Sequence, residues 1–376
     1  MKILLINHEF PPVGGGGATA CEYIVKYLTK TNERVEVLTS GFNALPKLEK
    51  IDNCVIRRIP SNRKKIYSGR IIEIILFVIN GIKLLKKEIK EIKPDITYAF
   101  FTMPAGFIAL YLKKKYNIRY YVFLRGIDLP GFYGGEFSFL NKMFSPIIKY
   151  IWINADKIIA NSQSLKELAF RTFNKKPIEI IPNGVDVNSF CPLEKAKRSN
   201  VIKILFVGRL NKQKGIDCLL KSIAKINKED RYPFVLEIVG DGSEKERLIN
   251  KSYVLGVSDR VIFSNWIDRS RIVDKYQSSD IFITTSLDEG MPNTLLEAMA
   301  CGLPVIASDI PAHRELITHN KNGLLVPVNN PDKVADTIKL LIENESLRIK
   351  MRQEGLKKIK DYSWQNIFAR LDKLNA

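Results

Sequence analysis

Residues 286–308 read Ser286-Leu-Asp-Glu289-Gly-Met-Pro-Asn293-Thr-Leu-Leu-Glu297-Ala-Met-Ala-Cys-Gly302-Leu-Pro304-Val-Ile-Ala-Ser308. An apolar run over 281–285 precedes them and predicts a strand, and the segment after Asn293 predicts a helix that follows an acidic loop. Pro292 suits the first helical position, because a proline lacks the N–H that would have no partner there. The order of strand, loop and helix is that of an α/β domain.

The junction between the acidic loop and the helix has the chemistry of a phosphate-binding site. Exposed N–H groups and the positive end of the helix dipole favour an anion at a helix N-terminus. Glu289 precedes that position and Glu297 is expected about two turns into the helix. Carboxylates are poor phosphate ligands, but they accept hydrogen bonds from the hydroxyls of a sugar or ribose attached to the phosphate. For Glu297 alone, a surface glutamate on an ordinary helix is an equally good explanation.

The segment resembles the E-x7-E signature of retaining glycosyltransferases of family 4, and it matches that signature in order from Glu289 to Ser308. The resemblance implies an α/β chain with the GT-B fold, in which two Rossmann-like doubly wound domains face a central cleft. It also implies that Glu289 binds hydroxyls of a donor sugar and Glu297 the ribose. The intervening donor-binding residues are Gly290, Met291, Pro292, Asn293, Thr294 and Leu295.

A second element, Gly208-Arg209-Leu-Asn-Lys-Gln-Lys214-Gly215, resembles the family's G-R-x-x-x-x-K-G motif. A departing nucleoside diphosphate gains negative charge, and Arg209 and Lys214 would stabilise that charge most in the transition state. These cations would replace a metal ion, and the chain has no Asp-x-Asp sequence. We therefore expect metal-independent chemistry without a cofactor. A solvated basic turn is the alternative.

Three further elements match the family more weakly. The Gly14–Gly17 run, with Gly15, Gly16 and Gly17 as donor-site candidates, lets backbone approach a phosphate or sugar. The loops that contain Asp241 and Ile267 each follow a predicted strand, and the resemblance places the nucleotide base at the second. Simple turns are the better explanation for the side chains of these two loops.

Arg125-Gly126-Ile127-Asp128 occupies the position of the family's His-Gly-x-Asp element. A guanidinium cannot act as a base, so the proton-accepting role suggested for that histidine does not transfer to Arg125. Arg125 could contact a phosphate or a sugar carboxylate, and Asp128 could position the acceptor. With Arg209, Lys214 and Glu289 they complete our set of candidate catalytic residues.

The alternation of apolar runs and helical patterns continues along the whole chain. We expect an acceptor-binding domain over 1–190, a nucleotide-sugar-binding domain over 191–355 and a C-terminal helix over 356–376 that crosses back to the first domain, the last on the resemblance alone. Residues 70–93 predict a long helix whose apolar positions, from Ile71 and Ile75 to Ile92, cover one face of the first sheet. Ser162 or Ser164 is expected to cap the helix that follows.

The net charge is +19, and residues 1–190 contain 29 lysines and arginines against 16 acidic residues. This excess indicates an anionic partner such as a membrane surface, a lipid phosphate or a nucleic acid. A Lys- and Ile-rich composition of the source genome explains it equally well. Among membrane sites, we favour Arg63-Lys64-Lys65 beside the amphipathic segment that begins at Ile71. No nucleic-acid motif is present, and we expect no nucleic-acid partner.

The five cysteines are scattered and suit a reducing cytosol, and the three histidines form no metal pattern. No apolar run reaches the roughly 18 residues that a membrane span needs. We expect a cytoplasmic enzyme, with the inner face of the cell membrane as a candidate site.

The combined expectation is a retaining transferase that moves a sugar from a UDP- or GDP-sugar to a hydroxyl of a glycan or lipid-linked acceptor, in polysaccharide or lipopolysaccharide biosynthesis. The alternatives are a nucleotide-sugar epimerase or hydrolase of the same fold and a non-catalytic sugar-nucleotide-binding protein. An epimerase would need a base such as His8 or His313, which no motif places in the site. The four residues Arg209, Lys214, Glu289 and Glu297 argue against a non-catalytic protein.

Overall fold

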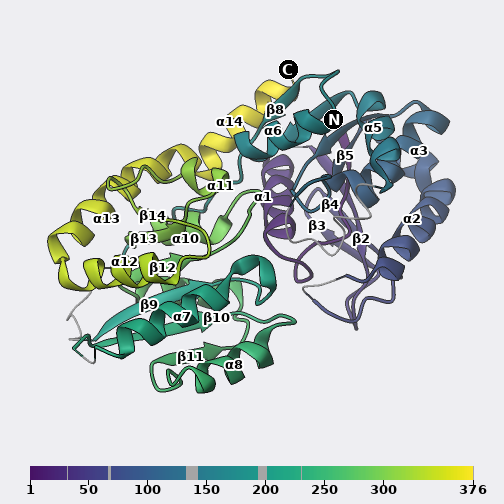
Figure 1. The fold of residues 1–376 in the computed structure, drawn as a ribbon. Helices are drawn as coiled ribbons and strands as arrows, with labels where there is room; N and C mark the ends of the chain where they lie inside the picture. The colour runs from purple at the N-terminus through teal and green to yellow at the C-terminus, as the bar shows by residue number, and fades with distance from the viewer. Residues whose placement is uncertain (32, 67–68, 133–142, 194–200, 230, 376) are drawn as a thin grey trace. The chain divides into compact units, whose positions relative to one another are not determined.

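The computed structural model describes residues 1–31, 33–66, 69–132, 143–193, 201–229 and 231–375. By packing, the chain forms two compact units. The first is Met1–Pro182 together with the end of the chain from Arg370, and the second is Asn183–Ala369. The predicted α/β class is confirmed, because each unit is built around one largely parallel sheet with helices in the crossovers (Figure 1).

The first unit contains an eight-stranded sheet in the order β3-β4-β2-β1-β5-β6-β7-β8. All neighbouring strands are parallel except β3 and β4, which form an antiparallel pair. Continuous Ile, Leu, Val and aromatic runs form the central strands because both of their faces are buried. The strands are β1 (Lys2–Ile6), β2 (Arg34–Ser40), β3 (Leu48–Ile51), β4 (Cys54–Ile59), β5 (Ile96–Phe100), β6 (Arg119–Phe123), β7 (Lys157–Ala160) and β8 (Ile178–Ile180).

Helices cover both faces of this sheet. One buried cluster joins the sheet to α2 (Ile71–Ile92), α3 (Phe107–Tyr116), α5 (Ser145–Asn154) and α6 (Gln163–Thr172). In this layer α2 contacts α3, and α3 contacts α5 (Figure 1). The expected cap of α6 is confirmed, since the Ser162 Oγ accepts a hydrogen bond from the N–H of Leu165. Helix α1 (Gly16–Lys30) directly follows the glycine run.

The predicted buried face of α2 was partly wrong. Ile71 and Ile75 are about half exposed, at 50 and 46 %. Leu85, Ile89 and Ile92 are buried as predicted, but in the first half of the helix the buried residues include Phe77 and Gly81 instead. At Gly81 an added Cβ would lie only 3.1 Å from the Cδ1 of Ile108, so this helix packs closely against α3. The apolar period was therefore read correctly, but its phase at the start of the helix is decided by the packing partner.

The second unit contains a six-stranded parallel sheet in the order β11-β10-β9-β12-β13-β14. Successive residues of β9 point to opposite faces: Ile204 and Phe206 join one buried cluster, and Leu205 joins the other. The strands are β9 (Ile202–Val207), β10 (Phe234–Val239), β11 (Val261–Ser264), β12 (Ile281–Thr284), β13 (Val305–Ser308) and β14 (Leu324–Val326).

Helices on both faces make this second sheet doubly wound. Residues of α7 and α12 pack in the first cluster, and those of α9 and α10 pack in the second. The helices are α7 (Ile216–Asn227), α8 (Lys245–Val254), α9 (Arg269–Gln277), α10 (Asn293–Ala300), α11 (Pro311–Arg314), α12 (Pro331–Glu343), α13 (Glu345–Ile359) and α14 (Trp364–Asn375).

Helix α14 begins in the second unit and ends in the first. Near its start, the Trp364 ring lies against Gly184, where an added Cβ would come within 2.6 Å of the ring. Near its end, the Tyr27 hydroxyl donates to Asp372, and the Lys157 Nζ donates to the carbonyl of Leu374 at 2.6 Å. The last turns of the chain are therefore part of the first unit.

Candidate active site

The loops that follow β9 and β12 lie next to each other at the carboxyl edge of the second sheet. The two strands are hydrogen-bonded neighbours, yet the chain runs from β9 to β10 on one side before it reaches β12 on the other. In open α/β sheets such a reversal of strand order is where ligands bind. The first loop contains Arg209 and Lys214, and the second contains Glu289. The fold thus brings the two strongest sequence motifs together.

Hydrogen bonds hold these two loops against each other. The Thr285 Oγ1 donates to the carbonyls of Lys214 and Gly215, at 3.2 and 3.1 Å. The N–H of Leu287 donates to the carbonyl of Gln213 at 2.8 Å. Gly215 has φ +62°, and an added Cβ would lie 2.2 Å from the Thr285 carbonyl oxygen. Only glycine fits here, because both the backbone conformation and the close approach exclude a side chain.

Lys214 and Glu289 form a buried ion pair across these loops. The Lys214 Nζ donates to the Glu289 Oε1, with side-chain exposures of only 17 and 12 %. The Ser286 Oγ donates to the same oxygen at 2.8 Å. Burial acts to raise the pKa of Glu289, but the nearby Lys214 charge outweighs burial, and the pKa lies below its usual range. Glu289 is therefore ionised, and an ionised carboxylate can accept hydrogen bonds from hydroxyl groups.

Arg209 is the cation of this site that is not engaged. Its side chain is half-buried, and within the described ranges it has no hydrogen-bond or ion-pair partner. A guanidinium without a protein carboxylate retains its donors for a ligand. Lys214 and Arg209 thus differ: the first is already paired with Glu289, and the second is available for an anion.

Helix α10 presents an uncapped N-terminus beside this ion pair. Pro292 is the cap residue and supplies no side-chain cap, so the helix begins at Asn293, one residue later than expected. The Asn293 Oδ1 accepts a hydrogen bond from the Asn183 Nδ2 at 2.8 Å, and Thr294 is half-buried beside it. Free N–H groups at the start of a helix bind anions. This helix start is the position at which the sequence predicts a phosphate-binding site.

The other residues between Glu289 and Glu297 are mostly buried and stabilise the loop by packing. Met291 and Leu295 are buried in the apolar cluster beneath the site, and Gly290 and Pro292 are buried beside them. Their side chains therefore stabilise the loop, and their backbone groups are what a donor could contact.

Glu297 lies just over one turn into α10, as its fifth residue, and not two turns in as expected. The Tyr276 hydroxyl donates to its Oε2 at 2.9 Å, and the Arg269 Nη2 lies 3.3 Å from its Oε1. Burial raises the pKa of Glu297, although Arg269 and Tyr276 act against it. Glu297 is 8 % exposed, so the protein holds its carboxylate in place through Tyr276 and Arg269.

The two weaker loops lie on the same sheet edge. Gly208 and Gly240 cross so closely that a Cβ on Gly240 would lie 2.0 Å from the Gly208 carbonyl oxygen. Asp241 is exposed, and its Oδ1 accepts from the N–H of Gly242 at 2.8 Å. Ile267 is half-buried against the apolar cluster, two residues before α9 begins. These loops follow β10 and β11, so they continue the same sheet edge beyond Arg209.

In the first unit, the glycine run forms the start of α1. Gly15 is the cap residue, Gly16 and Gly17 lie in the first turn, and Gly14 has φ +109°. A Cβ at Gly14 would come within 2.6 Å of the Cβ of Glu9, and one at Gly17 would lie 3.0 Å from the Phe101 ring. The run therefore lets the chain pack closely on both of these side chains.

A buried ion pair beneath this loop was missed in the sequence. The Arg63 Nη2 lies 3.1 Å from the Glu9 Oε1, and both side chains are nearly covered. The same Arg63 atom donates to the carbonyl of Ile66, which itself accepts from the N–H of Gly14. Our expectation that Arg63 faces an anionic surface is therefore wrong, since its charge is used inside the protein.

Arg125 and Asp128 lie at the carboxyl end of β6. The Asp128 carboxylate accepts hydrogen bonds from the N–H groups of Thr102 at 2.6 Å and of Arg125 and Gly126 at 3.0 Å. It thus joins the turns after β5 and β6. The Arg125 guanidinium stacks 4.5 Å over the Phe100 ring, and burial lowers its pKa to about 10. Asp128 therefore stabilises the loop after β6 by accepting hydrogen bonds from backbone N–H groups, and Arg125 is the positively charged residue of that loop.

The two candidate histidines are both buried and neutral. His8 packs against the rings of Phe77 and Phe101, and burial lowers its pKa to about 4. His313 follows β13, and burial lowers its pKa as well. Two residues of the second unit were not anticipated as part of the site: Ser286 and Ser308. Ser286 and Ser308 stand within the quoted segment, but nothing in their spacing predicts that they meet.

The described residues include neither a metal-binding cluster nor a helix that could span a membrane. They contain no group of three or more His, Cys, Asp or Glu side chains arranged to hold a metal ion. None of their helices combines the length and apolar character that crossing a bilayer requires.

Comparison with known proteins gives matches over both units. Residues 193–358 match the family described as "Glycosyl transferases group 1", and residues 14–189 match "Glycosyltransferase Family 4". The chain is 28 % identical to an uncharacterized glycosyltransferase of Methanocaldococcus jannaschii, over 98 % of this chain and 96 % of that protein.

Two solved structures share the fold. Sucrose-phosphate synthase from Thermosynechococcus elongatus superposes with a TM-score of 0.88 at 21 % identity, over 99 % of this chain and 98 % of that one. Anabaena HepE, in complex with UDP and glucose, superposes with a TM-score of 0.81 at 20 % identity, over 100 and 99 % of the two chains.

Proposed function

We propose, from the premise that this chain belongs to glycosyltransferase family 4 and is a GT-B glycosyltransferase, that it is a retaining, metal-independent enzyme that uses a nucleotide-sugar donor. The observation that supports this best is that the loop with Arg209 and Lys214 lies against the loop with Glu289 and the uncapped start of α10, with Lys214 paired to Glu289. Two cations and a helix N-terminus suit a diphosphate, and a buried ionised carboxylate suits sugar hydroxyls.

In the proposed reaction, the second unit binds the donor and the first binds the acceptor. Arg209 and Lys214 stabilise the charge that develops on the leaving nucleoside diphosphate. A leaving-group oxygen takes the proton of the acceptor hydroxyl while that hydroxyl attacks the same face of the sugar. Glu289 orients donor hydroxyls, and Glu297 contacts the ribose. The proton moves to the diphosphate, so the step needs no histidine base, in agreement with the buried neutral state of His8.

The donor is proposed to be a UDP- or GDP-sugar, since the similar Anabaena structure holds UDP and glucose. A panel of nucleotide sugars, screened by thermal shift and by release of the nucleotide, tests this. We expect one donor to raise the melting temperature of the wild type and to be hydrolysed slowly without acceptor. The same donor should stabilise Arg209→Ala far less. If no nucleotide sugar stabilises the wild type, the proposed function is wrong.

The acceptor is proposed to be a glycan or lipid-linked hydroxyl, met at the inner face of an anionic membrane. Helix α5 carries the surface that supports this. Its inner side packs in the core, but Ile147, Tyr150 and Ile153 are 37, 51 and 52 % exposed. Three exposed apolar side chains on one helix are unusual for a surface in contact only with water.

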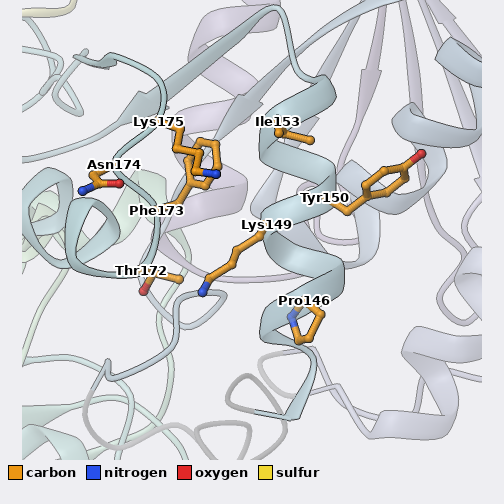
Figure 2. A pocket seen from close by; sticks show the side chains of 8 residues that line it. All are labelled: Pro146, Lys149, Tyr150, Ile153, Thr172, Phe173, Asn174 and Lys175. Atoms are coloured by element: carbon orange, nitrogen blue, oxygen red, sulfur yellow. The ribbon is translucent and has the colours of Figure 1, made fainter.

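Basic side chains surround this part of α5. Lys149 and Lys175 line a depression of about 420 Å³ together with Tyr150 and Ile153 (Figure 2). The Lys114 Nζ lies 5.2 Å from the centre of the Tyr150 ring. Apolar groups framed by lysines match the interface of an anionic bilayer, where each basic residue contributes about 1 kcal/mol. This surface replaces the Arg63 segment as our membrane site.

Co-sedimentation with vesicles tests the membrane proposal. We expect binding to anionic but not to neutral vesicles, and weaker binding at high salt. An Ile147→Gln/Ile153→Gln variant should lose most of its binding to anionic vesicles. Val254→Gln, which changes a residue of the second unit that is 86 % exposed, serves as the control and should bind as the wild type does. Equal binding to neutral vesicles, or an unaffected double variant, would refute this location.

A further inference from the structure

His313 occupies a buried position near enough to Lys214 and Glu289 for both charges to act on its pKa. It lies on α11, just after β13, and is fully covered. Its Nδ1 is 2.7 Å from the carbonyl oxygen of Ser308. Because a carbonyl only accepts, Nδ1 carries the hydrogen and Nε2 has a bare lone pair. Within the described part of the chain, this Nε2 has no hydrogen-bond partner.

A continuous set of hydrogen bonds joins this histidine to the ion pair. The Ser308 Oγ donates to the carbonyl of Ser286, and the Ser286 Oγ donates to the Glu289 Oε1 at 2.8 Å. Lys214 donates to that same oxygen. The bonds therefore link the ends of β13, β12 and β9, and the position of Glu289 depends on Ser286 and Ser308.

The charges around His313 act in opposite directions. Burial lowers its pKa most; the nearby Glu289 and Asp309 raise it, and Lys214 lowers it. The net effect is a lowered pKa, so the ring is neutral at pH 7. Protonation at lower pH would place an N–H on the buried Nε2, for which the described residues offer no acceptor, and a second cation near Lys214. Both effects are unfavourable inside a protein.

A buried histidine that only fills space needs neither of these features. An amide side chain could donate to Ser308 equally well and would never titrate. Among the described residues the Nε2 lone pair has no partner, and Ser308 and Ser286 connect His313 to Glu289; these two features distinguish His313 from a packing residue.

We propose that His313 is a positioning residue of the donor site: in its neutral Nδ1–H form it holds the Ser286–Ser308 contact on which Glu289 rests, and its protonation displaces Lys214 from Glu289 and weakens donor binding. This inference rests on the proposed function, because it assigns Lys214 and Glu289 to the donor.

The first test is independent of catalysis. The chain has three histidines, so long-range ¹H–¹⁵N spectra assigned with single His→Asn variants resolve each ring. We expect the Nδ1–H tautomer for His313 in the free protein. Its titration midpoint should rise in Lys214→Met, which removes a like charge, and fall in Glu289→Gln, which removes an opposite one. An Nε2–H tautomer, or a midpoint that neither variant moves, would overturn the proposal.

The second test measures binding of UDP by calorimetry between pH 8 and pH 4.5. We expect the wild type to lose affinity at low pH, approaching tenfold per pH unit below the midpoint. His313→Asn, which retains a donor for Ser308, should lose this pH dependence and bind better at pH 8 than His313→Ala. His319→Asn, which changes an exposed histidine, should follow the wild type. The same acid loss in His313→Asn would overturn the inference. Absence of UDP and GDP binding at every pH would refute the proposed function instead, and the spectra would still decide the coupling.

Discussion

Replacing Lys214 by methionine leaves the carboxylate of Glu289 buried without its charged partner. The two side chains are 17 and 12 % exposed, so solvent can replace little of the lost interaction. Removing one member of a buried pair typically costs about 3–5 kcal/mol. For a unit of this size that corresponds to a melting temperature lower by about 10 °C. We therefore expect Lys214→Met to be clearly less stable than the wild type at pH 7.5.

The pH dependence of this deficit has a definite sign. In the wild type the pKa of Glu289 is lowered, so its contribution is present above the pKa of the unfolded chain and is lost as the pH falls through the folded value. In Lys214→Met burial dominates and raises that pKa, so the carboxyl takes up a proton as the pH falls and the penalty disappears. The difference in stability should therefore be largest at neutral pH and shrink toward pH 4.

Urea and thermal unfolding of both proteins across this pH range provide the measurement. Lys212→Met, an exposed lysine of the same loop, is the matched control and should stay within about 0.5 kcal/mol of the wild type. Equal stability of Lys214→Met and the wild type at pH 7.5 would refute the buried pair. A deficit that stays constant down to pH 4 would show that lost packing, and not the charge of Glu289, is responsible.

Three other predictions concern the same site. Arg209→Ala should lower turnover about 100-fold while the unfolding free energy changes little, because this side chain has no partner among the described residues; a near-normal rate would remove it from the mechanism. Chelation with EDTA should leave transfer intact, and a complete loss restored by Mg²⁺ or Mn²⁺ would contradict the metal-free reaction. Gly215→Ala should destabilise the protein by at least about 1–3 kcal/mol and weaken UDP binding, since its Cβ would meet the Thr285 carbonyl. Gly256→Ala, also at positive φ (+66°) but with nothing within 4 Å of its Cβ, should show the backbone strain alone, and equal effects of the two variants would contradict the clash.

The sequence alone was sufficient for the α/β class, the family and most strands and helices, because these depend on local patterns. A buried parallel strand needs a short apolar run, and a helix start needs a cap or a proline, as at Ser162 and near Pro292. The motifs from Gly208 to Gly215 and from Glu289 to Glu297 are likewise short contiguous stretches, so they could be recognised in the sequence. Their order along the chain was enough to predict which residues share a sheet edge.

Only the tertiary structure decided how charged and polar groups pair. Lys214 and Glu289 are 75 residues apart, and Arg63 and Glu9 are 54 apart, so no local pattern shows that they meet. The role of Asp128, the anchoring of Glu297 by Tyr276 and the exposed start of α2 likewise depend on distant partners. Local preference determines which elements form, whereas the solvation and pairing of a side chain depend on which element packs against it. For that reason, only the tertiary structure shows that His313 bonds to Ser308 and Ser308 to Ser286, at the adjacent ends of β13 and β12.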